Sequence, residues 1–292
     1  MSNTYTGNFQ IGFRRGGDWQ KDIDALIAWA KENQFSAIDT GFNSSEAIKK
    51  IKSAGLGTGS VDLMDWSGYG ALISPDKATR DGAVGKAAAN IEASAAAGAK
   101  NFFTVMVPEK ADLPRKENFG YMIESYGALV PVLEKVGGRL VVEGWPGPGA
   151  LCCTPETYRA LFHELPSHAV GVNYDPSHLI RMGIDPLRFL NEIAVRVFHV
   201  HGKDTALYSE HLYEFGHEQP PTFAAAPAFG SMAWRYTIPG HGQARWVEIL
   251  QVLKNVGYKG CVSIELEDAN FNGTEEGEKR GFIQSRQFLE GC

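Results

Sequence analysis

Residues able to bind a metal or move a proton stand at the ends of four apolar runs in the second half of the chain. The four segments read Val141-Val142-Glu143-Gly144-Trp145, Asn173-Tyr174-Asp175-Pro176-Ser177-His178, Val197-Phe198-His199-Val200-His201-Gly202-Lys203-Asp204 and Val262-Ser263-Ile264-Glu265-Leu266-Glu267-Asp268. A buried carboxylate is costly unless it is paired, so several carboxylates that converge with an imidazole require a cation between them. Such an oxygen-rich set with one imidazole suits Mn, Mg or Fe. If the four ends meet, the segments predict a divalent-metal site.

The third segment contains two histidines, and their spacing distinguishes them. Side chains alternate along a strand with a period of two, so His199 and His201 point to the same side. His201 is nearer the end of the run and is therefore the better ligand, whereas His199 should lie one layer deeper. Any one of these polar residues taken singly could equally be an ion-paired core residue. The indication of a site rests on all four segments together.

Short β-rich runs alternate with helical patterns along the whole chain. Strands are predicted at 9–14, 37–41, 57–64, 101–108, 140–145, 171–175, 195–201 and 261–267, and helices at 18–32, 44–53, 76–97, 117–136, 155–164, 185–192, 243–256 and 275–290. Eight strands, each followed by a helix, indicate an α/β (β/α)8 barrel, with a doubly wound open sheet as the competing architecture. No linker or repeat divides the chain, so residues 1–292 are predicted to form one domain. In such a barrel, the carboxyl ends of the strands carry the active site.

Residues 205–242 are the main irregularity of this pattern. This long segment follows the seventh strand and contains Tyr208, His211, Tyr213, Phe215, His217, Phe223, Phe229, Trp234 and Tyr236, together with several prolines. Long loops of this kind usually carry function. The segment is expected to be a lid or a partner-binding segment over the metal, and the alternative is packing against another subunit.

Composition excludes several classes of protein. The 292 residues are 43% hydrophobic and 21% charged, with a net charge of −6, which argues against a nucleic-acid partner. No apolar run approaches the roughly 20 residues that would span a membrane. The N-terminal residues are not expected to form a signal peptide, because they contain neither a basic nor an apolar segment, and the four cysteines suggest neither a disulfide framework nor a zinc knuckle. A cytoplasmic location is expected.

The combination of Glu143, Asp175-x-x-His178, His201-Gly202-Lys203-Asp204 and Glu265 resembles the sugar isomerase/epimerase superfamily of xylose-isomerase-like TIM barrels. The stretch Ile238-Pro239-Gly240-His241-Gly242 resembles the proline–glycine loop of that family. The resemblance implies that Glu143, Asp175, His201 and Glu265 hold one divalent ion, in the first place Mn, with Mg, Co, Fe or Zn as alternatives. It also implies that His178 and Lys203 face the substrate, and His241 and Trp145 are expected to bind substrate with them.

The implied reaction removes a proton next to the carbonyl of a sugar or keto-sugar, with Glu143 and Glu265 as the acid/base pair and His178 assisting. Return of the proton gives isomerisation or epimerisation. The alternative is β-elimination by a lyase or dehydratase, for example from a 3-keto-glycoside with an O- or C-linked aglycone. An alternative of another class is an inactive sugar-binding barrel. The DNA-repair branch of the superfamily, with three zinc ions, is disfavoured because the first histidine of this chain is His163.

Overall fold

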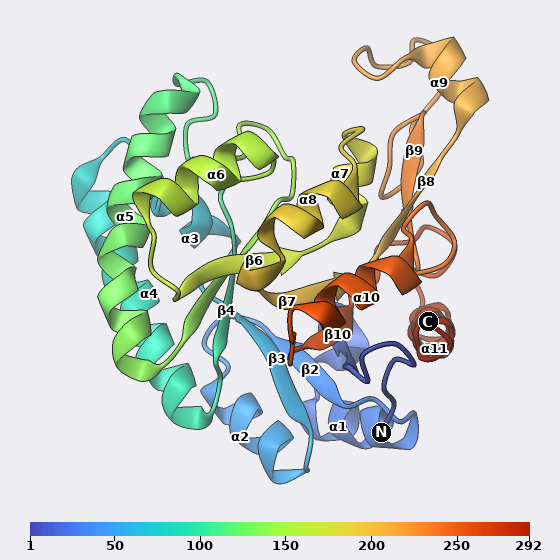
Figure 1. Ribbon diagram of the computed structural model, residues 1–292, viewed down its shortest axis with the longest axis horizontal. Coiled ribbons are helices and arrows are strands. Elements are labelled where there is room, and N and C mark those ends of the chain that lie inside the picture. The colour runs from blue at the N-terminus through green and yellow to red at the C-terminus, as the bar shows by residue number, and fades with distance from the viewer.

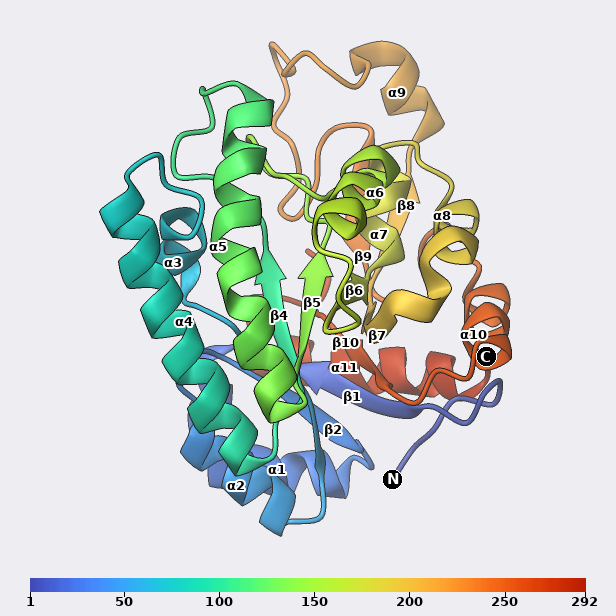
Figure 2. The same cartoon turned by 60° about the vertical axis from the view of Figure 1, so that its left-hand side comes forward.

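The computed structural model describes all 292 residues and shows a closed parallel barrel (Figures 1 and 2). Its strands are β1 (Gln10–Arg14), β2 (Ala37–Thr40), β3 (Gly57–Asp62), β4 (Asn101–Val105), β5 (Arg139–Glu143), β6 (Val170–Tyr174), β7 (Val197–Gly202) and β10 (Cys261–Ile264). Their order around the barrel is β1-β10-β7-β6-β5-β4-β3-β2. The predicted (β/α)8 barrel is therefore confirmed, and the open sheet is excluded. Six of the eight observed strands end one to three residues earlier than the predicted runs, and Asp175 and Glu265 directly follow two of these strands.

The register of the parallel strands brings the polar ends together. Val105 of β4 pairs with Glu143 of β5, Glu143 pairs with Asn173 of β6, and Asn173 pairs with His199 of β7. On the other side of β7, His201 pairs with Ser263 of β10. The strand interiors are buried and rich in branched apolar residues, as parallel sheets covered on both faces require.

Helices cover the outside of the barrel. They are α1 (Ile23–Glu32), α2 (Ser45–Ser53), α3 (Trp66–Ala71), α4 (Lys77–Ala97), α5 (Arg115–Val136), α6 (Pro155–Glu164), α7 (Pro176–Arg181), α8 (Pro186–Ile193), α10 (Trp246–Asn255) and α11 (Glu275–Glu290), with the 3-10 turns η1 (Asp18–Gln20) and η2 (Ala194–Arg196). The helix predicted over 18–32 is divided, because the side chain of Asp22 caps a new start by accepting from two backbone N–H groups. The short helices α3 and α7 were not predicted. No helix combines the length and the apolar character needed to cross a membrane.

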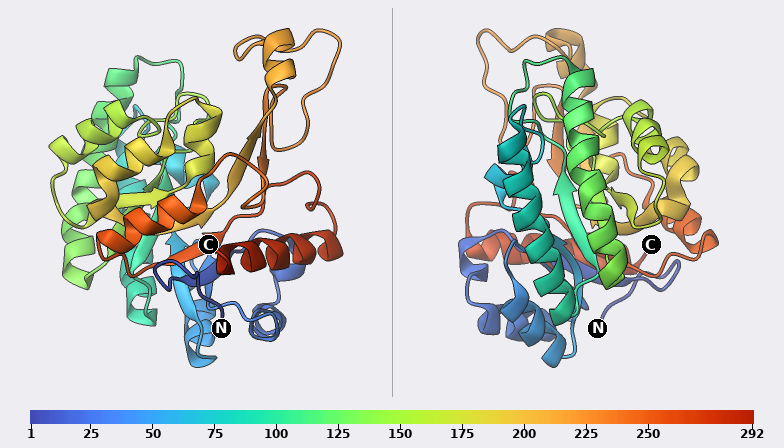
Figure 3. Two further views of the ribbon diagram at one scale, coloured as in Figure 1. Left: turned by 45° about the vertical axis from the view of Figure 1, so that its right-hand side comes forward. Right: turned by 90° about the vertical axis from the view of Figure 1, so that its left-hand side faces the viewer.

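Residues 204–237 form an arm, defined here as β8 (Asp204–Leu207), α9 (Ser209–Phe215), β9 (Trp234–Thr237) and the residues between them. The segment predicted as a loop over 205–242 thus contains an antiparallel two-stranded ribbon, with Asp204 opposite Thr237 and Leu207 opposite Trp234. These strands are too short for alternation to reveal them in the sequence. Figure 3 shows the arm rising from the barrel, with α9 far from the other helices. No residue of 209–228, which includes α9, is buried, so this tip of the arm does not pack against the barrel in this structure.

Candidate active site and metal centre

The structure brings together the four residues expected to hold a metal. Glu143 is the last residue of β5, Asp175 directly follows β6, His201 lies in β7, and Glu265 directly follows β10. One ligand atom of each lies within 4.8 Å of the corresponding atoms of the other three. The first three are buried and Glu265 is partly exposed, so the group opens to solvent on one side. These four residues are called the ligand cluster below.

The two nitrogens of His201 face different partners. Its Nδ1 lies 2.5 Å from Glu143 Oε2 and 3.4 Å from Glu265 Oε2, and therefore points into the ligand cluster. Its Nε2 lies 3.6 Å from Asp39 Oδ2, on the side of the barrel interior. The ring stacks on Phe103, with centroids 5.4 Å apart and planes 29° apart, which holds the imidazole in this orientation. A carboxylate behind a ligating histidine is a common way to fix its tautomer and its basicity.

The donor atoms fit a divalent metal. Asp175 Oδ2 and His201 Nδ1 are buried and have no hydrogen-bond partner of adequate geometry. Buried polar atoms of this kind need an explanation, and a shared cation provides one. Three carboxylates and one imidazole are a donor set for Mn, Mg, Fe, Co or Zn rather than for a thiolate-bound structural zinc. The chain therefore has a buried carboxylate–histidine group that could bind a metal.

Neighbouring charges keep both glutamates ionised. Burial and the Glu265 carboxylate raise the pKa of Glu143, but the imidazoles of His201 and His178 outweigh them and hold it well below its usual range. Burial likewise raises the pKa of Glu265, while Lys203, His201 and Arg14 lower it further than burial raises it. Ionised carboxylates are the form that binds a cation and accepts a proton.

Lys203, expected to face the substrate, lies among the carboxylates. Its Nζ is 2.5 Å from Glu265 Oε2, 2.9 Å from Glu267 Oε2 and 3.3 Å from Asp175 Oδ2. The residue is only 1% exposed. Burial lowers the pKa of its ammonium group, but the three carboxylates raise it well above the usual value. Lys203 therefore carries a fixed positive charge that contacts two members of the ligand cluster.

His178 also lies beside the ligand cluster. It belongs to α7, whose first turn is capped by Asp175, because Asp175 Oδ1 accepts from the Ser177 backbone N–H at 2.8 Å. His178 Nε2 lies 3.3 Å from Glu143 Oε1 and 3.4 Å from Asp175 Oδ2. Its Nδ1 lies 2.6 Å from the hydroxyl of Tyr236 in β9. The base of the arm therefore contributes to the surroundings of this histidine.

The sequence analysis did not identify Asp39. This residue lies among the buried polar side chains directly below the ligand cluster. Asp39 Oδ1 accepts from the Ser60 backbone N–H at 3.0 Å and from Ser263 Oγ at 2.9 Å, and Oδ2 lies 2.8 Å from His199 Nε2. His199 thus occupies the deeper position expected for it. Burial lowers and Asp39 raises the pKa of His199, with a net rise to about 9. Asp39 lies next to the last residue of β2, so the strand-end rule that identified Glu143 could also have found it.

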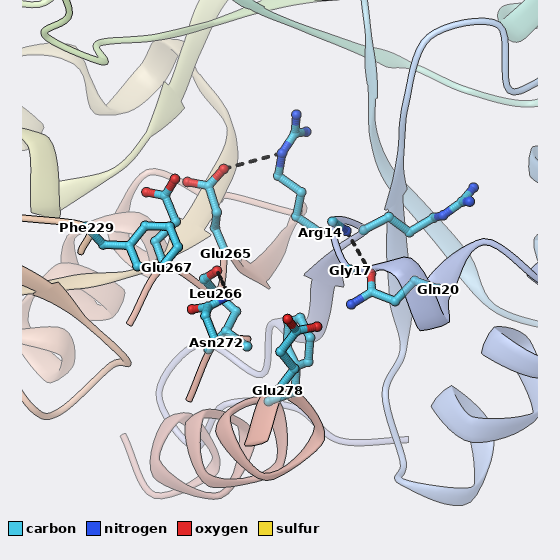
Figure 4. A pocket seen from close by; sticks show the side chains of 12 residues that line it. Arg14, Gly17, Gln20, Phe229, Glu265, Leu266, Glu267, Asn272 and Glu278 are labelled. Atoms are coloured by element: carbon cyan, nitrogen blue, oxygen red, sulfur yellow. Dashed lines mark hydrogen bonds and ion pairs between the residues drawn. The ribbon is translucent and has the colours of Figure 1, made fainter. Parts of the chain in front are cut away.

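A hollow of about 380 Å³ adjoins the cluster at the mouth of the barrel (Figure 4). Arg14 Nε lies 3.3 Å from Glu265 Oε1, and Arg14 Nη2 lies 2.8 Å from Asp62 at the end of β3. In Figure 4, Arg14 points toward Glu265, and Phe229 of the arm lies on the side of Glu265 and Glu267. The lining is mostly polar, as expected of a site for a hydroxylated ligand.

Two residues expected to bind substrate lie elsewhere at the mouth. Trp145, two residues after Glu143, packs edge-on against the exposed Trp66 of α3, with ring centroids 5.5 Å apart. His241 is exposed, lies 6.4 Å from the ring of Phe271 and has no contact with the ligand cluster. Its proline–glycine loop is held instead by Asp204, whose carboxylate accepts from the backbone N–H groups of Gly240 and Ala244 at 3.2 and 2.8 Å.

Both the sequence and the fold of this chain have relatives among known proteins. The family model described as xylose isomerase-like TIM barrel matches residues 27–292. The uncharacterized protein YfiH of Bacillus subtilis is 36% identical over 143 residues, which is 48% of this chain and 44% of that protein. An inosose dehydratase of Geobacillus thermodenitrificans is 26% identical over 159 residues, or 54% of this chain and 50% of that enzyme. The matches thus span about half the length of these curated relatives.

Solved structures share the fold at low sequence identity. A D-tagatose 3-epimerase-like protein superposes with a TM-score of 0.70 and 17% identity, covering 96% of this chain and 95% of its own. A 3-keto-D-glucoside 4-epimerase from E. coli gives a TM-score of 0.68 at 15% identity, covering 97% of this chain and all of its own. At these identities the likeness establishes the barrel alone.

Proposed function

This chain belongs to the xylose isomerase-like TIM barrel family, and on that basis we propose that it is a divalent-metal-dependent sugar isomerase or epimerase. The observation that carries the proposal is the double orientation of its two glutamates. Glu143 turns Oε2 toward His201 and Oε1 toward His178, and Glu265 turns Oε2 toward His201 and Oε1 toward Arg14. Each carboxylate therefore has one oxygen inside the ligand cluster and another outside it, where it can take or return a proton.

The positions of Glu143 and Glu265 in the barrel suit proton transfer on two sides of a substrate. Their strands, β5 and β10, are separated in the barrel by β6 and β7. A sugar bound between them meets one carboxylate from each side, so one can remove a proton from carbon and the other can return it. A bound divalent cation would polarise the oxygens of an adjacent carbonyl and hydroxyl and so increase the acidity of the C–H bond between them. Lys203 supplies positive charge beside Glu265, and His178, whose Nε2 lies 3.3 Å from Glu143 Oε1, would face a substrate oxygen bound beside that glutamate.

Elimination is the second candidate reaction of the same site. Two observations favour it: the inosose dehydratases among the relatives, and the hollow beside Glu265, which is bordered by Phe229 of the arm and has room for a group larger than a free sugar. In this reaction, proton removal next to a carbonyl is followed by departure of a hydroxyl or aglycone from the neighbouring carbon. The same glutamates serve both outcomes, so the products must distinguish them.

The test begins with metal analysis of the purified protein and continues with a panel of keto-sugars, inososes and 3-keto-glycosides in deuterated water. Isomerisation or epimerisation predicts a product of unchanged formula that carries solvent deuterium on carbon. Elimination predicts loss of water or release of an aglycone. Glu143→Gln and Glu265→Gln should stop deuterium uptake, whereas Glu156→Gln, on the surface of α6, should not. A metal-loaded protein that exchanges no C–H bond of any compound with solvent would contradict the proposal.

A further inference from the structure

The hydroxyl of Tyr236 joins the arm to His178. Tyr236 lies in β9 and is 3% exposed. Its oxygen lies 2.6 Å from His178 Nδ1 and accepts a hydrogen bond from Arg181 Nη1, also at 2.6 Å. Arg181 is three residues after His178 in α7, and its other terminal nitrogen donates to the Pro146 carbonyl at 3.0 Å. The guanidinium also lies over the ring of Trp234, 4.4 Å from its centroid, so it is held from three directions.

The donors and acceptors in this group determine where its hydrogens lie. A guanidinium can only donate, so the Tyr236 oxygen accepts from Arg181 and must direct its own hydrogen elsewhere. The acceptor within reach is His178 Nδ1. On the other side of the ring, Nε2 faces the carboxylate oxygens of Glu143 and Asp175, which only accept. One arrangement satisfies every atom: Nδ1 is bare and Nε2 carries the proton.

We propose that Tyr236, held by Arg181, is a positioning residue that fixes His178 as the Nε2–H tautomer and aims this proton at the ligand cluster. The inference rests on the proposed function, because it assigns His178 as the hydrogen-bond donor to a substrate oxygen bound beside Glu143. The opposite tautomer would place a nitrogen lone pair against two carboxylates and leave the Tyr236 hydrogen without an acceptor. Burial raises the pKa of the Tyr236 phenol above its usual value, so the hydroxyl keeps this hydrogen. The base of the arm is thereby part of the catalytic apparatus, while its tip lies in solvent.

Nitrogen NMR of protein labelled at the histidine rings tests the assignment without any substrate. The His178 resonances are identified by their loss in His178→Gln. We expect a protonated Nε2 and a bare, hydrogen-bonded Nδ1 in the wild type, and a displaced Nδ1 resonance in Tyr236→Phe. Tyr213→Phe, which removes an exposed phenol from the same arm, should leave the spectrum unchanged. A protonated Nδ1 in the wild type, or an Nδ1 resonance that does not move in Tyr236→Phe, would overturn the proposal.

Turnover provides the second readout. We expect Tyr236→Phe to lower kcat by roughly 10- to 100-fold, the usual cost of losing a group that orients a catalytic residue, with metal content unchanged and KM little affected. Arg181→Met, which frees the Tyr236 oxygen, should act in the same direction. A loss that appears in KM alone would overturn the positioning role. If the wild type turns over no sugar, the proposed function fails, yet the NMR result still decides the tautomer.

Discussion

Glu143, Asp175, His201 and Glu265 sit on or directly after neighbouring strands of a closed barrel, whereas α9 at the tip of the arm has no buried residue. Both regions belong to the carboxyl end of the barrel, and they are built in opposite ways. In the ligand cluster, a substitution leaves buried charges without partners, which is costly. In the arm tip, a substitution changes only solvated surface. The comparison indicates that the rigid sheet holds the ligand cluster, whereas residues 209–228, none of which is buried, should tolerate substitution.

Asp175→Asn, a substitution in the ligand cluster, is expected to have the largest effect on metal binding and turnover. The amide can still cap α7 but removes a negative ligand oxygen, so bound metal should be lost and kcat should fall about 10³-fold, equivalent to several kcal/mol of transition-state stabilisation. Asp65→Asn, which alters the cap of α3 near the surface, is the matched control. The measurements are metal content per chain and turnover. Full metal content in Asp175→Asn would show that the cluster is not the metal site.

Asp39→Asn tests the layer below the cluster and should have the next largest effect. The substitution removes the buried negative charge that faces His199 and His201, so metal affinity should fall by roughly 10- to 100-fold. The free energy of unfolding of the metal-free protein should fall by about 3–5 kcal/mol, because a buried partner is left uncompensated. Metal titration and urea unfolding measure the two effects. Lower stability with unchanged metal affinity would mean that Asp39 acts only on the fold.

The ligand cluster and the buried residues below it also differ in how far the sequence predicted them. The barrel follows from a rhythm of buried strands and amphipathic helices, and the ligand cluster follows from polar residues at the ends of those strands. Both are local patterns, and parallel register then brings them together. Asp39 was missed although the same rule applies to it, because the first half of the chain contains no histidine to draw attention to its carboxylates.

Other contacts could not be read from the sequence, because they join distant segments. The pairing of β8 with β9 spans more than twenty residues that form no continuous pattern. The contact of Tyr236 with His178 depends on that pairing and on the position of α7, which was itself not predicted. The expectation for His241 came from the resemblance of its loop, yet Asp204 holds that loop so that the imidazole lies in solvent. Such outcomes depend on tertiary packing rather than on local sequence.

The buried Asp39–His199 pair should make the stability of the metal-free protein depend on pH. The folded pKa of His199, about 9, is above its unfolded value, so its contribution is complete below about pH 6.5 and is lost as pH rises toward 9. We expect a loss of about 2–3 kcal/mol between pH 6.5 and 10. Burial raises the pKa of Asp39, but His199 and His201 lower it well below its usual value, so the contribution of this carboxylate is lost only in acid. Urea unfolding across this range should show the free energy of unfolding falling as pH rises, and His199→Gln should reduce that pH dependence. An equal pH dependence in His199→Gln would show that other groups cause it.

Removal of the arm tip tests the opposite side of the comparison. Replacement of residues 209–228 by a short glycine–serine linker keeps β8, β9 and Tyr236, so the free energy of unfolding should change by less than about 1 kcal/mol. If the tip selects the substrate, kcat/KM should fall about tenfold for bulky glycosides and little for free keto-sugars. Kinetics on both classes and the oligomeric mass are measured together. If the kinetics are unchanged and the oligomeric mass falls, residues 209–228 contact another subunit and do not select the substrate.

The smallest effect is expected from a single phenylalanine of the arm, and it gives the most direct comparison of the two regions. Phe223 is fully exposed, so Phe223→Ser should change the free energy of unfolding by no more than about 0.5 kcal/mol. Phe103 is 3% exposed and packs between His201 and the Arg14 guanidinium, so Phe103→Ser should cost about 3–5 kcal/mol and weaken metal binding as well. Thermal unfolding at several protein concentrations measures the stability of both variants, and metal titration measures the affinity of Phe103→Ser. If Phe223→Ser destabilises the protein in a concentration-dependent way, the phenylalanine is buried against a second chain, and the arm would have to be regarded as an interface rather than as free surface.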